Sequence, residues 1–185
     1  MARARLSTAG VVELALAVID EQGLEQLTLA AVAARAEVAT PSLYKHVASL
    51  AQLRSLIGVR VMEDMTEQLT LAVVGRSGDD AVASLMRAGR AYVVRHPARY
   101  AAMPADALHD PATQAAGNRL LQVFLRVLHA YHLEGSAAIH AIRCLRAIMH
   151  GFTSLEAAGG FGLPEGLDDT YEQLIQMFVA SLPRP

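Results

Sequence analysis

The chain has 185 residues, of which 53% are hydrophobic and 18% charged, and its formal net charge at pH 7 is −2. That hydrophobic fraction excludes a disordered chain, and the longest segment without Asp, Glu, Lys or Arg, residues 173–183, is too short to span a membrane. The single cysteine, Cys144, excludes an intrachain disulfide, and Glu13 interrupts the apolar start, so we expect a reduced, cytoplasmic protein without a signal peptide.

The composition predicts an all-α fold of about nine helices, because Ala, Leu, Val and Met dominate and no segment alternates with the period of two that is typical of strands. The first helix is expected from residue 7 or 8 to residue 22. Ser7 or Thr8 provides a capping hydroxyl, and Gly23 can take the left-handed conformation that ends a helix.

Two short helices joined by a tight turn are predicted next, over residues 29–35 and 41–47. Thr28 is a suitable N-cap for the first, and the second is entered through Thr40 and Pro41, since proline favours the first helical position. This is the pattern of a helix-turn-helix. Leu43 and Val47 lie four residues apart and are expected to point inward. The outer face then presents Thr40, Ser42, Lys45 and His46, which can reach phosphates and base edges.

Longer helices make up the rest of the chain. An apolar stripe at a spacing of four predicts a helix over residues 50–73, carried by Leu53, Ile57, Val61, Met65 and Leu69. Further helices are expected over residues 79–95, around residue 100, and over residues 112–132, 135–158 and 169–182.

The segment LTLAAVAARAEVATPSLYKHV, residues 27–47, resembles the DNA-binding signature of the tetracycline-repressor (TetR) family of bacterial transcriptional regulators. The resemblance is most specific over residues 7–60. The turn of this family usually contains a glycine, and this chain has Glu37 at that position. The resemblance implies a DNA-binding domain over residues 1–49 and a ligand-binding and dimerisation domain over residues 50–185. It implies a DNA surface made by Thr28, Thr40, Pro41, Tyr44, Lys45 and His46, and the outer face described above adds Ser42.

The charge distribution has the sign that DNA binding needs, although it is weak. Residues 1–60 contain six basic and five acidic residues, a net charge of +1, whereas the remainder contains ten basic and thirteen acidic residues, a net charge of −3. Arg3 and Arg5 are either a basic arm that reaches into a minor groove or a solvated terminus.

The two last helices predict a homodimer. The helix over residues 135–158 is apolar around most of its circumference, so it must be covered on more than one side, either by a second copy of the chain or by its own domain. The resemblance also implies a dimer, and residues 150–164 resemble a TetR subgroup with a His-Gly signature. The predicted interface consists of Ile142, Leu145, Met149, Phe152, Tyr171, Leu174, Ile175 and Phe178.

The resemblance further implies a small-molecule effector bound between about residues 60 and 155. Methionine and aromatic side chains make adaptable apolar walls, although at these spacings they are also ordinary core residues. The candidate lining residues are Met62, Met65, Met86, Tyr92, Tyr100, Met103, Arg119 and Phe124.

An alternative function is an all-α metal-dependent enzyme that uses His129, His132, His140 and His150. No nucleophile motif or phosphate-binding glycine loop accompanies them, and Cys144 is expected to be packed in an apolar setting. We therefore predict a non-enzymatic, ligand-responsive regulator without a cofactor. Its expected partners are a pseudo-palindromic double-stranded DNA operator, an effector and a second copy of the chain, but no membrane.

Overall fold

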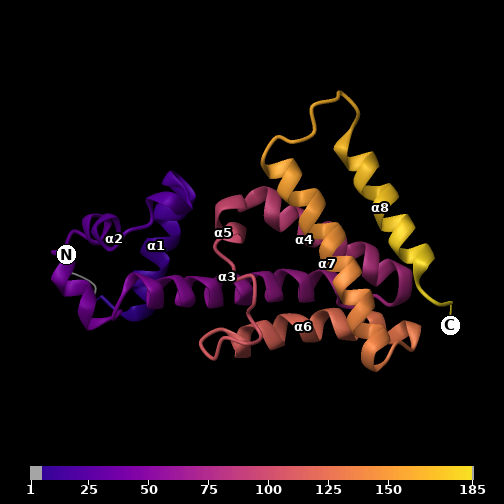
Figure 1. Ribbon diagram of the computed structural model, residues 1–185, viewed down its shortest axis with the longest axis horizontal. Helices are drawn as coiled ribbons and strands as arrows, with labels where there is room; N and C mark the ends of the chain where they lie inside the picture. The colour runs from indigo at the N-terminus through magenta and orange to yellow at the C-terminus, as the bar shows by residue number, and fades with distance from the viewer. Residues whose placement is uncertain (1–5, 185) are drawn as a thin grey trace. The chain divides into compact units, whose positions relative to one another are not determined.

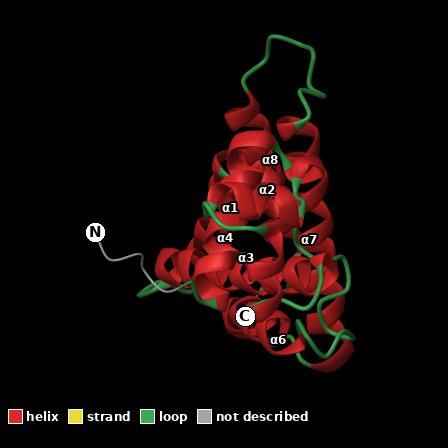
Figure 2. Ribbon diagram, turned by 90° about the vertical axis from the view of Figure 1, so that its left-hand side faces the viewer, coloured by secondary structure: helices red, strands yellow, loops and turns green. Residues whose placement is uncertain are grey.

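The computed structural model describes residues 6–184, and every regular element in that range is a helix. Figure 2 shows these helices joined by loops, with no strand in the described part. The all-α prediction is confirmed. The elements are α1 (Thr8–Gln22), η1 (Leu24–Gln26), α2 (Leu29–Arg35), η2 (Thr40–Lys45), α3 (Leu50–Val73), α4 (Gly78–Arg95), α5 (Pro97–Ala101), α6 (Gln114–Leu128), η3 (His129–Tyr131), α7 (Gly135–Ala157) and α8 (Leu167–Ser181), where η denotes a 3-10 helix.

The predicted helix boundaries are confirmed where a cap defines them. The Ser7 hydroxyl accepts a hydrogen bond from the Gly10 N–H, Gly23 adopts a φ of 89° after α1, and the Thr28 hydroxyl accepts from the Ala31 N–H. The prediction for residues 41–47 was wrong in type, because η2 is a 3-10 helix. Its N–H groups at Ser42 and His46 bond to carbonyls three residues earlier.

The chain divides into two compact units, which are described separately. Unit 1 combines the residues up to Glu63 with Ala98–Asn118, and unit 2 combines Asp64–Pro97 with the residues from Arg119 onward. This partition differs from the predicted functional domains, because α3 and α6 each contribute to both units. The predicted division at residue 49 concerns function and stays a prediction.

In unit 1, α1 packs against η1 and α2, and α2 packs against η2 (Figure 1). The fully buried side chains of this unit include Leu16, Ile19, Leu27, Leu43, Leu53 and Ile57. Residues 98–118 pack closely on α3, since a Cβ atom at Gly58 would lie 2.9 Å from Cδ of Pro104.

In unit 2, α4 contacts both α7 and α8 (Figure 1). Tyr171 of α8 is buried and its hydroxyl donates to the Met86 carbonyl at 3.0 Å. Arg90 of α4 forms two hydrogen bonds to Glu156 of α7, at 2.7 and 2.8 Å, and an ion pair with Asp168 of α8. Arg87 of α4 adds two hydrogen bonds to Glu172 of α8, both at 2.6 Å. The unit is therefore held by apolar packing and by arginines that link α4 to α7 and α8. No described helix is long and apolar enough to cross a membrane.

Candidate nucleic-acid interface

The helix-turn-helix segment is anchored by the two residues predicted to face inward. Leu43 is 0% exposed and Val47 is 1% exposed, and both pack in the core of unit 1. The Thr8 hydroxyl donates to the His46 carbonyl at 3.1 Å, which ties the end of η2 to the start of α1. The orientation of η2 is therefore fixed from both sides.

The outer face of η2 carries the predicted polar residues. Tyr44 is 56% exposed, which is unusual for a ring of this size, and Lys45 is exposed. Pro41 is exposed as well, whereas Thr40, Ser42 and His46 are half-buried. Together they form a surface that offers hydroxyls, a ring and a cation, which are the groups that contact DNA phosphates and base edges.

Thr28 lies at the start of the preceding helix and is exposed, but its hydroxyl already accepts a hydrogen bond from the Ala31 N–H at 3.0 Å. It therefore positions α2 whether or not it also touches DNA. Arg3 and Arg5, the predicted arm, lie outside the described residues.

The turn between α2 and η2 has a Schellman geometry. The Glu37 N–H bonds to the Ala34 carbonyl, and the Val38 N–H bonds to the Ala33 carbonyl, both at 3.1 Å. Glu37 adopts a φ of +53°, in the left-handed region that glycine favours. Glu37 therefore holds a backbone conformation in which a glycine would be less strained.

Three arginines of unit 1 are paired with carboxylates. Arg35 forms two hydrogen bonds to Glu21, at 2.5 and 2.6 Å, and these hold the pKa of the Glu21 carboxyl below its usual value. Arg60 bonds to Glu13 at 2.9 Å, and Arg99 binds Asp20 through both Nε and Nη2. These pairs tie α1 to α2, α3 and α5 and leave those arginines with little net charge to offer a ligand.

The predicted dimer interface consists mostly of side chains that a single chain already buries. Seven of its eight residues are already buried within one chain, including Leu145 at 0% and Tyr171 at 1% exposed, and Leu174 is half-buried. These seven side chains are Ile142, Leu145, Met149, Phe152, Tyr171, Ile175 and Phe178, and they form the core between α4, α7 and α8. One chain therefore already covers most of their surface, and a contact of these residues with a second chain stays a prediction.

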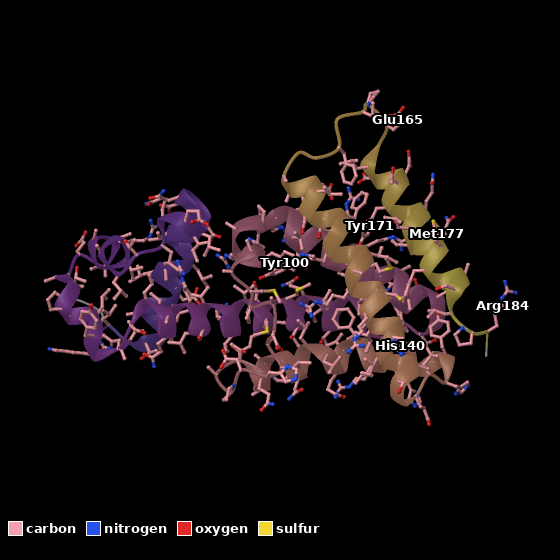
Figure 3. All side chains as sticks on the ribbon, viewed as in Figure 1. Tyr100, His140, Glu165, Tyr171, Met177 and Arg184 are labelled. Carbon is pink, nitrogen blue, oxygen red and sulfur yellow. The ribbon has the colours of Figure 1, made fainter. Side chains whose placement is uncertain are left out.

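The exposed side of α7 carries residues other than those of the predicted interface. Cys144 was expected to be packed but is exposed, and Ala147 and Gly151 share its face of the helix. His140 of α7 and Met177 of α8 are exposed as well (Figure 3), and Met177 is 67% exposed.

Of the predicted effector-lining residues, Tyr92 lines a groove that is described below, and the role of the other seven stays a prediction. Five of the predicted residues are buried, and Arg119 is exposed. The buried ones are Met62, Met65, Met86, Tyr92 and Phe124, and the half-buried ones are Tyr100 and Met103. Tyr92 is the one that lines a described groove.

This groove, which we call the α3–α4 groove, has a volume of about 450 Å³ and lies within unit 2. Tyr92 is 5% exposed and donates its hydroxyl to the Asp64 carboxylate at 3.1 Å, and its ring lies 5.3 Å from the His96 ring. The groove is lined by Asp64, Gln68, Leu71, Ala72, Ala88, Ala91, Tyr92, Arg95 and His96. The polar lining residues were not among those predicted, although the spacing of four between Asp64 and Gln68 on α3 was a usable signal.

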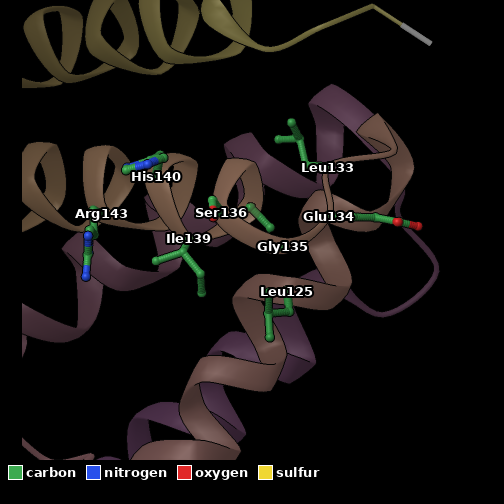
Figure 4. Close-up of a pocket in the computed structure, with 9 residues that line it drawn as sticks. Leu125, Leu133, Glu134, Gly135, Ser136, Ile139, His140 and Arg143 are labelled. Carbon is green, nitrogen blue, oxygen red and sulfur yellow. The ribbon is translucent and has the colours of Figure 1, made fainter.

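A second, more open groove lies between the end of α6 and the start of α7. Figure 4 shows Leu125 of α6 opposite Ile139 of α7, with His140 and Arg143 at one end. The four histidines of the alternative enzyme hypothesis do not form a metal site, because residues 6–184 contain no group of three or more His, Cys, Asp or Glu side chains able to hold a metal ion. The enzyme hypothesis therefore lacks the metal-binding cluster that it required.

Comparison with known proteins gives a consistent result. The family model described as "Bacterial regulatory proteins, tetR family" matches residues 11–54, and the one described as "Tetracyclin repressor-like, C-terminal domain" matches residues 82–178. An HTH-type transcriptional regulator of Mycobacterium tuberculosis is 37% identical over 158 residues, which cover 84% of this chain and 72% of that protein.

Solved structures share the fold. A protein of unknown function from Rhodococcus sp. RHA1 superposes with a TM-score of 0.81 at 20% identity, covering 98% of this chain and 97% of the other. A TetR variant from Acinetobacter baumannii AYE, solved in complex with minocycline, superposes with a TM-score of 0.73 at 18% identity, covering 95% and 96% of the two chains.

Proposed function

The chain belongs to the TetR family of bacterial transcriptional regulators, and on that basis we propose that it is a ligand-responsive repressor. In this proposal it acts in the cytoplasm as a homodimer, binds a pseudo-palindromic operator through residues 1–49, and is released when an effector binds in residues 50–185. Two recognition elements about 34 Å apart would read successive major grooves.

The observation that carries the DNA-binding part is the outer face of η2. Buried Leu43 and Val47 hold the element, so that exposed Tyr44 and Lys45 are presented by a fixed support rather than by a mobile loop. A rigid support of this kind is what base recognition requires, because each direct contact depends on the position of the recognition element.

The test is binding of the purified protein to a labelled fragment of the DNA upstream of its own coding sequence, followed by fluorescence anisotropy at several salt concentrations. We expect a complex whose affinity falls steeply with salt, and a weaker complex with scrambled DNA. Equal affinity for both fragments at every salt concentration would contradict a specific operator.

For the effector we propose the α3–α4 groove. Gly89 lies beside Leu69, and Tyr92 bonds to Asp64, so the two helices run antiparallel, with Asp64, Arg95 and His96 at one end and Leu71 toward the other. Arg95 pairs with no carboxylate among the described residues. The groove therefore suits a small amphipathic molecule whose polar end accepts hydrogen bonds from Arg95.

This part is tested by screening amphipathic acids for release of the labelled DNA, and then repeating the titration with Arg95→Ala. The variant is expected to bind DNA like the original protein but to need at least ten times more of the compound for release. An unchanged response would exclude the groove as the effector site while leaving the DNA-binding proposal intact.

A further inference from the structure

Unit 1 contains seven Arg and Lys residues and eight Asp and Glu residues, so any attraction for a phosphate backbone has to be local. Arg35, Arg60 and Arg99 are neutralised by Glu21, Glu13 and Asp20, as described above. Of the basic side chains described in unit 1, Lys45 and Arg54 pair with no carboxylate. A phosphate backbone approaching this unit would therefore meet its unneutralised charge at these two residues.

Arg54 lies on the second turn of α3, and its exposure is enforced by the helix itself. Leu53 and Ile57 are both 0% exposed and fix the inner face of α3 in the core. Arg54 follows Leu53 by about 100° around the helix and is exposed to solvent. Because side chains on a helix lean toward its N-terminus, the guanidinium extends toward the start of α3, which follows Lys45 by only five residues.

Part of the backbone at the start of α3 is already hydrogen-bonded. The Ser49 hydroxyl accepts from the Gln52 N–H at 3.1 Å, and the Gln52 side-chain oxygen accepts from the Ala48 N–H at 2.5 Å. These bonds form a capping arrangement that satisfies two of the donors a phosphate could otherwise use. A side chain near this end of α3 can add a phosphate contact to those that the remaining backbone donors could make.

We propose that Arg54 is a second phosphate contact, which positions the helix-turn-helix on DNA together with Lys45. This inference rests on the proposed DNA-binding function. A guanidinium suits the role, since it stays charged at every relevant pH and can bind a phosphate through two parallel hydrogen bonds. The contact is to the backbone, so it contributes affinity and register without sequence preference.

The test compares the salt dependence of operator binding for Arg54→Ala, Arg54→Lys, Lys45→Ala and Arg60→Ala. Arg60→Ala is the matched control, because it removes the same formal charge from the same helix, but a charge that Glu13 already balances. For Arg54→Ala and for Lys45→Ala, the plot of log K against log salt should become less steep, by about 0.9 for each DNA-binding domain that contacts the DNA. Arg60→Ala and Arg54→Lys should keep the original slope.

Two results would overturn the role of Arg54. One is an unchanged slope for Arg54→Ala while Lys45→Ala lowers it, and the other is an equal change for Arg54→Ala and Arg60→Ala, which would reflect overall charge only. Absence of salt-dependent DNA binding by the original protein would overturn the proposed function itself, and so the two failures are distinguishable. Thermal melting of each variant confirms that the fold is retained.

Discussion

Glu37 occupies a backbone conformation that an L-residue with a Cβ atom adopts only at a cost. Its φ of +53° closes the turn between α2 and η2, and a non-glycine residue in this region loses about 1 kcal/mol relative to glycine. We therefore expect Glu37→Gly to raise the free energy of unfolding by about 1 kcal/mol, measured by urea denaturation.

The control for that prediction is Glu37→Ala, which removes the carboxylate but keeps the Cβ atom. If strain is the cause, the alanine variant gains little or nothing. Equal stabilisation by alanine and glycine would show that removal of the charge, not of the strain, is responsible.

Tyr131 gives a prediction at alkaline pH. Its side chain is 5% exposed and its hydroxyl donates to the Asp79 carboxylate at 2.6 Å, and burial followed by this bond raises the pKa of Tyr131 well above its usual value. The folded protein thus holds the proton more tightly than the unfolded chain, whose tyrosine titrates near pH ~10. The stabilisation is complete below that pH and is lost as the pH rises above it.

Tyr131→Phe should therefore lower the free energy of unfolding at pH 7 by about 1 kcal/mol. The difference between the two proteins should narrow above pH ~10, because the phenylalanine variant has no proton to lose at this position. Urea denaturation at pH 7, 9 and 10.5 measures this difference. A gap that stays constant with pH would contradict the assigned bond.

Individual site residues were predictable where a spacing decides which face they occupy. Leu43 and Val47 lie four residues apart, so their burial and the exposure of Lys45 followed from helical geometry. Cys144 was predicted to be packed but is exposed, and Arg95 was not singled out, since the surroundings of both depend on which neighbouring helix covers them. That information is long-range and is absent from local periodicity.

Among the elements, α3 was predictable from local periodicity, whereas the helix type of η2 was not. The 24 residues of α3 carry a sustained stripe and its bounds were predicted to the residue. The six residues of η2 gain little from either hydrogen-bonding pattern, so tertiary anchoring decides between an α-helix and a 3-10 helix.

The Arg90 cluster is the main polar connection between α4, α7 and α8. The side chains of Arg90 and Glu156 are 16% and 15% exposed, and the guanidinium also lies 5.4 Å from the ring centre of Phe152 and 5.2 Å from that of Tyr171. Removal of the arginine would leave a partly buried carboxylate without its partner. Arg90→Ala should therefore lower the free energy of unfolding by about 2–4 kcal/mol.

Arg76→Ala is the matched comparison for Arg90→Ala. Arg76 also binds a carboxylate through two close contacts, to Asp80, but both side chains are about half exposed. Such a pair contributes under about 0.5 kcal/mol. Equal losses for the two variants, measured by urea denaturation, would contradict a special role for the cluster.

For the whole molecule, the apolar pattern of α7 and α8 identified buried residues but not what buries them. Burial of an apolar side chain is non-directional, so a core within one chain and an interface between two chains give the same periodicity. Leu145, predicted at the interface, is in fact covered by its own chain. We therefore expect a dimer built on α7 to use the opposite face of this helix.

That face includes three small exposed residues, which allow a second helix to approach closely: Cys144, Ala147 and Gly151. The exposed polar side chains of His140, Arg143 and His150 flank them. We expect the original protein to sediment as a dimer at micromolar concentration. The Ala147→Arg variant should sediment as a monomer, because each introduced arginine would be buried against its counterpart in the second chain. The melting temperature of the monomeric variant should show that its fold is retained. Leu145→Ala should behave in the opposite way, with a loss of about 2–5 kcal/mol in unfolding free energy, because it opens a cavity in the core. A monomeric original protein would refute the dimer, and a dimeric Ala147→Arg variant would move the interface away from this face of α7.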